Sequence, residues 1–272
     1  MPTPPTDRQE PSQETAQQPS GRRVRRALAR WTAVALAFAG AAAATAIPLI
    51  ALDRSDVPGL ATVSDGRWDY PALTLPALPS GSPLPLAEEN EGNIHHADLR
   101  ALLLPAPAGA TPDTKLHGGW TSIERYVAEY EKTRRASMRQ HLTDSALRHI
   151  AARGWTMPDG TKARVYLLRF TTRHHAERFV KDELKLMSGW YQSPPLHNAP
   201  DNRVDGDWDS SGAPRDLQQY PFSERAPYGA EQTRHAYVPA GDTIAFLVHE
   251  KKGGAAAVPF HQSMVLQMQL LA

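Results

Sequence analysis

The chain has 272 residues, of which 41% are hydrophobic and 22% are charged, and it contains 24 prolines but only 6 phenylalanines. This composition predicts one modest folded domain with extended segments attached to it. There is no cysteine, which excludes disulfides, thiolate metal sites, a cysteine nucleophile and a lipid anchor on an N-terminal cysteine.

The N-terminal part of the chain carries the strongest signal. Residues 1–20 have almost no large apolar side chain, so they cannot offset the entropy cost of ordering and we expect a disordered tail. The segment 21–52 begins with a basic flank of five arginines and continues from Trp31 to Leu52 without a charge. At about 1.5 Å per residue, a helix over 31–52 is roughly 33 Å long and crosses a hydrocarbon core of about 30 Å.

The arginine flank also predicts the orientation of this transmembrane helix. Basic residues stay on the cytoplasmic side, so we expect a single-pass protein of the cell membrane, with a cytoplasmic N-terminus and an extracytoplasmic C-terminal part. Nucleic-acid binding would also use arginines, but their position beside an apolar span favours a topogenic flank, and we expect no nucleic acid partner. Ala44-Thr45-Ala46 fits a signal-peptide cleavage site. The apolar run continues beyond it, which favours an uncleaved anchor and leaves cleavage as the alternative.

Residues 53–119 are rich in proline and alanine and predict a stiff stalk. Within this stalk, 97–105 has leucines at helical spacing and predicts a short helix that docks onto the domain. His95 and His96 precede it. Neighbouring histidines point apart and chelate a metal poorly, so we expect them in a solvated loop.

The folded domain is predicted at 120–272. A capping box at Thr121–Glu124 begins one helix, and a second short helix is expected from Thr143. A hairpin follows around Pro158-Asp159-Gly160, with a second strand that is apolar on both faces. The segment 174–187 then has the spacing of an amphipathic helix. His174 and His175 begin it, either as ordinary first-turn residues or beside an anion.

The same order recurs 81 residues later, with Gly241 at the position of Gly160. A strand and then an apolar helix over 258–271 follow this second turn. We therefore predict an α+β fold: a two-layer sandwich in which two pseudo-repeated hairpin-helix units form one antiparallel sheet with both helices on one side.

A long connection, 188–230, separates the two units. A connection of this length is functional or disordered, and its aromatic residues favour packing. We expect a ligand site here, lined by Trp190, Tyr191, Trp208 and Tyr220.

Four aspartates in this connection raise the question of a metal site. Asp205, Asp207, Asp209 and Asp216 occupy positions 1, 3, 5 and 12 of a calcium loop. However, the sixth position is Ser210 instead of glycine, and nearby prolines oppose flanking helices. We predict no metal site, no cofactor, and no calcium binding tighter than about millimolar.

The sequence contains no nucleophile elbow, zinc-protease motif, phosphate loop or dinucleotide glycine pattern. Beyond residue 52, 24 basic and 26 acidic residues nearly balance (30 − 6 and 29 − 3), which argues against a polyanion binder. The function predicted is therefore an extracytoplasmic binding, sensory or envelope-accessory domain, and not an enzyme. Its partner would be a small molecule or an envelope protein. The alternatives are an exported hydrolase-type enzyme with its site in 188–230 and a purely structural tether.

Overall fold

The structure is a computed structural model that describes residues 64–186 and 192–272. The predicted tail, transmembrane helix and signal-peptide site lie outside these residues, as do Trp190 and Tyr191. Within the described ranges, no helix is both long enough and apolar enough to span a membrane. The compact unit runs from Asp65 to Ala272.

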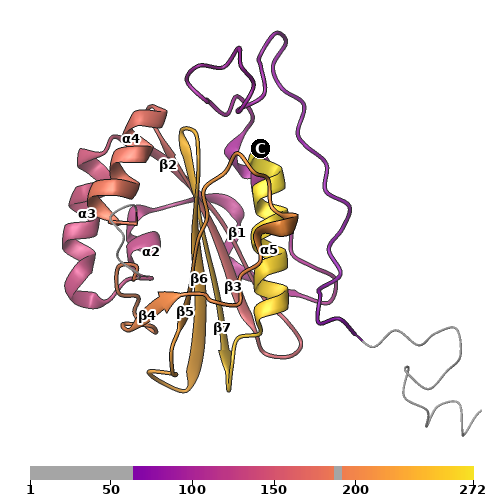
Figure 1. Ribbon diagram of the computed structural model, residues 1–272, viewed down its shortest axis with the longest axis vertical. Helices are drawn as coiled ribbons and strands as arrows, with labels where there is room; N and C mark the ends of the chain where they lie inside the picture. Colours follow the sequence, from indigo (N-terminus) through magenta and orange to yellow (C-terminus); the bar gives the residue numbers. More distant parts are fainter. Residues whose placement is uncertain (1–63, 187–191) are drawn as a thin grey trace, which may run out of the picture. The chain divides into compact units, whose positions relative to one another are not determined.

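The centre of this unit is a seven-stranded sheet in the order β1-β2-β3-β7-β6-β5-β4, in which every pair of neighbours is antiparallel (Figure 1). The predicted α+β fold with an antiparallel sheet is therefore confirmed. The strands are β1 (Thr111–Thr121), β2 (Leu147–Thr156), β3 (Lys162–Phe170), β4 (Asn202–Val204), β5 (Tyr220–Glu224), β6 (Glu231–Ala240) and β7 (Thr243–Lys252).

The two predicted hairpins, β2–β3 and β6–β7, lie side by side because β3 pairs with β7. Both expected glycines take the left-handed conformation in the turns, with φ of 84° at Gly160 and 55° at Gly241. As predicted, β3 is apolar on both faces. Tyr166 belongs to one hydrophobic cluster and Val165 to the other.

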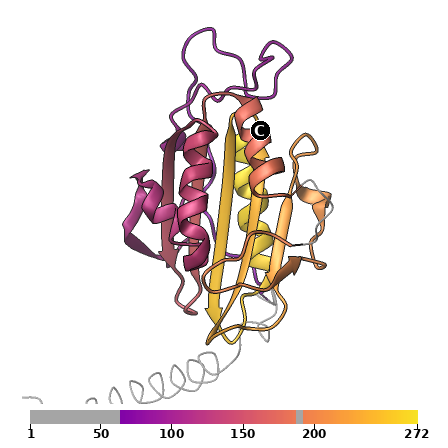
Figure 2. The same cartoon turned by 90° about the vertical axis from the view of Figure 1, so that its left-hand side faces the viewer.

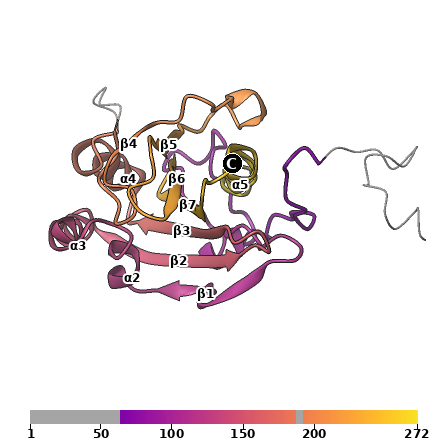
Figure 3. The same cartoon turned by 90° about the horizontal axis from the view of Figure 1, so that it is seen from below.

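Helices cover both faces of the sheet, so the prediction that they pack on one side is wrong. Figures 1 and 3 show α2 (Ile123–Val127), α3 (Arg135–Asp144) and α4 (Arg173–Arg178) on one side and α5 (Ala257–Leu271) on the other. Figure 2 looks onto the face that α3 and α4 cover. A π-helical turn, Phe179–Glu183, extends α4. Phe179 and Phe260 accordingly belong to different clusters. The unit therefore has three layers.

The links between strand and helix give the physical reason for this difference. Only residues 171–172 separate β3 from α4, whereas 253–256 separate β7 from α5. The longer link contains Gly253 and Gly254, which have φ values of 81° and 144° that other residues rarely adopt. These glycines let the chain turn toward the opposite face of the sheet. The pseudo-repeat thus extends over the hairpins and not over the helices.

Residues 65–106, called the strap below, pack on the sheet and α5. They belong to the segment 53–119 for which the sequence predicted a stiff stalk with a short docking helix. The backbone N–H and C=O of Trp68 both bond the Gln262 side chain, each at 2.8 Å. The hydroxyls of Tyr70 and Ser263 lie 2.9 Å apart. The Trp68 ring stacks on that of His249 at 4.8 Å. The expected docking helix is present as a 3-10 turn, Leu99–Leu102, with two buried leucines.

Several local expectations differ from the structure. Ser122, not Thr121, caps α2 by accepting the N–H of Arg125. The helix expected from Thr143 is wrong, because α3 ends at Asp144 and β2 begins at Leu147. Two further 3-10 turns lie at Lys132–Arg134 and Ser210–Gly212, and the connection 188–230 contributes β4 and β5 to the sheet edge.

Candidate functional site

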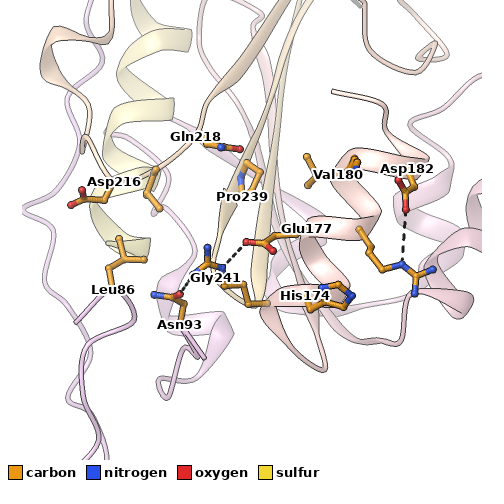
Figure 4. A pocket seen from close by; sticks show the side chains of 14 residues that line it. Leu86, Asn93, His174, Glu177, Val180, Asp182, Asp216, Gln218, Pro239 and Gly241 are labelled. Atoms are coloured by element: carbon orange, nitrogen blue, oxygen red, sulfur yellow. Dashed lines mark hydrogen bonds and ion pairs between the residues drawn. The ribbon is translucent and has the colours of Figure 1, made fainter. Parts of the chain in front are cut away.

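A groove of about 650 Å³ lies between α4, the strap, the β6–β7 turn and the segment 216–218 (Figure 4). Its volume is within the usual range for small-molecule sites. The lining combines apolar side chains with charged and amide groups. The apolar part consists of Leu86, Val180, Leu217 and Pro239.

The helical wall of the groove is basic on balance. His174, Glu177, Arg178 and Lys181 follow one another at helical spacing, so they share one face of α4 and its π-helical extension. Two of the charges on this wall are already paired on the helix itself, by the contacts of Arg173 with Glu177 at 2.6 Å and Arg178 with Asp182 at 4.0 Å. Lys181 has no hydrogen bond or ion pair with any described residue.

The opposite wall presents an acid. Asp216 is exposed and, like Lys181, makes no ion pair within residues 64–186 and 192–272. Gln218 beside it accepts a hydrogen bond from the Tyr220 hydroxyl at 2.8 Å, which leaves its amide N–H groups unused. The groove thus offers one uncommitted cation and one uncommitted anion from different segments of the chain.

The strap reaches the groove through Asn93, which lines it together with Gly241. Asn93 has φ of 46°. Its side-chain oxygen accepts a hydrogen bond from Arg173, and its backbone carbonyl accepts the N–H of Asp242 at 3.1 Å. The groove is therefore assembled from parts that are distant in sequence. The wall at Asn93 forms only when the strap packs against the β6–β7 turn.

The structure does not bring the described members of the predicted aromatic site together. Trp208 packs at the edge of the cluster under α5, and its indole N–H donates to Gln219 at 3.0 Å. Tyr220 packs against the cluster on the other face of the sheet. From the predicted loop, it is the segment 216–218 that lines the groove.

Three of the four aspartates interact with neighbouring groups, and Asp216 makes no ion pair with a described residue. Asp205 is buried and contacts Arg234 at 2.5 Å and His261 at 3.0 Å. Although burial opposes ionisation, these hydrogen bonds lower the pKa of Asp205 to about 2. Asp207 lies 3.5 Å from the same Arg234, and Asp209 caps the turn at Ser210–Gly212. In the described part of the chain, no group of three or more metal-ligating side chains is found.

A buried serine–histidine contact escaped the sequence analysis because 42 residues separate its members. Ser193 Oγ lies 2.6 Å from His235 Nε2 and 3.1 Å from the side-chain oxygen of Asn202. His235 Nδ1 has no hydrogen-bond partner among the described residues, and burial lowers the pKa of this histidine to about 3. A ring that resists protonation and lacks an orienting acid is a poor general base. The hydroxyl instead completes a chain of hydrogen bonds that ends at Asn202.

Comparisons with known proteins do not place the chain in a family. No family model matches it, and no curated protein matches it. Among solved structures, it is similar to the extracellular domain of PknH from Mycobacterium tuberculosis, with a TM-score of 0.38 and 13% sequence identity. The alignment covers 68% of this chain and 97% of that chain. A likeness at this level assigns neither a ligand nor an activity.

Proposed function

We propose that the chain is a membrane-anchored protein whose extracytoplasmic α+β domain binds a small ligand in the groove. The observation that carries this proposal is the groove itself, with about 650 Å³ of space and a lining drawn from four separate segments. Asp216 and Lys181 provide unpaired charges of opposite sign beside the apolar Leu217 and Val180. This lining favours a small ligand that has an apolar part and both an anionic and a cationic group.

The anchor in this proposal comes from the sequence. The arginine flank at 21–30 and the uncharged span at 31–52 support a single membrane crossing with the folded domain outside the cytoplasm. No catalytic role is proposed, because the contact between Ser193 and His235 lacks an acid partner and a ring that readily accepts a proton.

The topology is tested by reporter fusions. Reporters joined after Leu52 should be active only outside the cytoplasm, and the full-length chain should sediment with membranes after carbonate washing, because an apolar helix resists extraction. A matched fusion after Ser20 should be active only in the cytoplasm. Activity of the Leu52 fusion inside the cell would contradict the proposed orientation.

Ligand binding is tested with the full-length chain in detergent against a panel of amino acids, dipeptides, nucleotides and sugar phosphates. We expect saturable binding by a zwitterionic member of the panel, weakened about tenfold or more by Lys181→Ala and by Asp216→Ala, which corresponds to about 1.4 kcal/mol each. Isothermal titration calorimetry gives the affinities.

The matched control is Lys132→Ala, since Lys132 is also an exposed lysine but lies away from the groove. Its affinity should equal that of the unmodified protein. Binding that Lys181→Ala and Asp216→Ala leave unchanged, or no binding by any member of the panel, would show that the groove is not the site.

A further inference from the structure

Two residues of the groove wall also hold the strap on the β6–β7 turn. Asp242 N–H donates to the Asn93 carbonyl at 3.1 Å. The neighbouring Gly241 approaches so closely that a Cβ atom there would lie within 1.9 Å of the same carbonyl oxygen. This contact joins the segment before His95 to the turn, and it leaves no room for the strap to shift while the turn stays in place.

His95 makes the second part of this attachment. Its side chain is fully buried, with Nδ1 2.8 Å from Asp242 Oδ1 and Nε2 3.1 Å from the backbone carbonyl oxygen of Leu271. Both neighbours are acceptors. A neutral imidazole has only one N–H, so either neutral tautomer would place a nitrogen lone pair against an oxygen lone pair. The doubly protonated ring donates to both neighbours.

The charged groups nearest to His95 come from the β6–β7 turn and from β3. Asp242 on the turn is the acid in contact, and it also accepts from Arg169 of β3 at 3.1 Å and from the Thr243 hydroxyl at 2.9 Å. Burial opposes its ionisation, but the hydrogen bond from His95 and the charge of Arg169 hold the pKa of Asp242 below its usual value. The carboxylate therefore remains an acceptor.

Two further elements, α4 and α5, contribute less charge around the ring. From α4, Arg173 contacts the strap at Asn93 and not at the ring. The last turn of α5 has no charged side chain and presents the Leu271 carbonyl, at the helix end where the backbone dipole favours a cation. The adjacent His96 is exposed. Arg169 opposes a charged ring, but it is bound to the other oxygen of Asp242.

We propose that His95 is a protonated latch that seats the strap on the β6–β7 turn and α5, so that the groove wall at Asn93 loosens when the ring loses a proton. As a regulator of ligand binding, this latch rests on the proposed function of the groove. As a device of the fold, it does not depend on any ligand.

The direction of the effect follows from the two acceptors. Because both neighbours of the ring are acceptors, the attachment is complete when both ring nitrogens carry a proton, and it weakens when a rise in pH removes one of them. At the acid end it is limited by Asp242, whose lowered pKa keeps the carboxylate charged until the pH falls below its ordinary range.

The latch is tested on the full-length chain by hydrogen exchange, measured by mass spectrometry at pH 6 and pH 8 and corrected for intrinsic exchange rates. Protection of strap peptides around 86–97 should be about tenfold lower at pH 8, relative to peptides from β3 in the same sample. Comparing peptides within one sample separates the latch from global changes in stability, which other buried histidines also affect.

Two variants sharpen the result. In His95→Leu, strap protection should be low at both pH values, whereas His96→Leu changes the exposed neighbour and should behave like the unmodified protein. If His95→Leu fails to fold, the ¹⁵N chemical shifts of the ring in unmodified protein decide the question at pH 6. Two protonated nitrogens are expected, and one unprotonated nitrogen, or strap protection that does not change with pH, would overturn the proposal.

The outcomes also separate the latch from the ligand site. If strap protection falls as the pH rises in a protein that binds no member of the panel, the latch is supported and the proposed function is not. A ligand whose affinity is the same at pH 6 and pH 8 while strap protection changes would show that the latch does not regulate the groove.

Discussion

Replacing Gly241 with alanine should destabilise the domain by more than about 3 kcal/mol, a loss in the range that marks severe steric conflict. Gly241 has φ of 55°, and a Cβ atom would lie 1.9 Å from the Asn93 carbonyl oxygen, which is backbone and cannot rotate away. Relief of this overlap requires the strap to leave the turn. Chemical denaturation of the full-length chain, together with hydrogen exchange of the strap, measures both effects.

Gly160→Ala is the matched control for this change. Gly160 also has positive φ, at 84°, but nothing lies within 4 Å of a Cβ atom there. The Gly160→Ala variant should lose only about 1 kcal/mol of stability, because alanine disfavours a positive φ. Protection of the strap should be unchanged. Equal losses in the two variants would mean that the contact between Gly241 and Asn93 contributes nothing.

Replacing Arg164 with methionine should cost about 3–5 kcal/mol, because it leaves carboxylates buried without their cation. Arg164 contacts both oxygens of Glu129, at 2.7 and 2.8 Å, and reaches Glu250 at 2.9 Å. The side chains of these three residues are only 16%, 12% and 7% exposed. Equilibrium unfolding at pH 7 measures the loss.

The pH dependence of this variant gives a second readout. Burial opposes ionisation of Glu250, but the charge and hydrogen bond of Arg164, together with the Asn198 hydrogen bond and the charge of Lys162, lower the pKa of the carboxyl group. This contribution is present above the usual pKa and is lost as the pH falls through the lowered value. Without Arg164, only the Asn198 hydrogen bond and the charge of Lys162 oppose the effect of burial, which favours the neutral acid. The stability deficit of the variant should therefore shrink as the pH falls. A deficit that grows toward acid would contradict the role of Arg164.

Lys162→Met, on the same strand, is the control for the Arg164 variant. Lys162 pairs with Glu231 at 2.7 Å, but it is 48% exposed. Pairs of this kind contribute about 0–1 kcal/mol because water screens the charges. A loss comparable to that of the Arg164 variant would show that charge removal, and not burial of the pair, determines the effect.

The hairpins and their glycine turns were predictable from the sequence because both signals are local. Pro158-Asp159-Gly160 and Gly241 restrict the backbone at the turns themselves, and the apolar pattern of β3 requires cover on both faces. Which face each helix takes depends on the short links after β3 and β7. No periodicity within the helices carries that information.

The groove and the strap were not predictable in the same way. Proline-rich sequence resembles a stiff stalk, and contacts distant in sequence, such as those of Trp68 and Tyr70 with polar side chains of α5, show that it is held. His95 is a similar case. Its partners, Asp242 and Leu271, are 147 and 176 residues away, so a pair of neighbouring histidines read alone gave the wrong expectation of a solvated loop.

The order of the strap and α5 along the chain has a consequence for biosynthesis. The ribosome makes Trp68 long before Gln262, which lies 194 residues later. At about 5–20 residues per second, the interval is roughly 10–40 s. During that time the aromatic and leucine side chains of the nascent strap have no helix to pack on. We therefore expect this segment to need protection by chaperones or by the translocation machinery until the last helix has been synthesised.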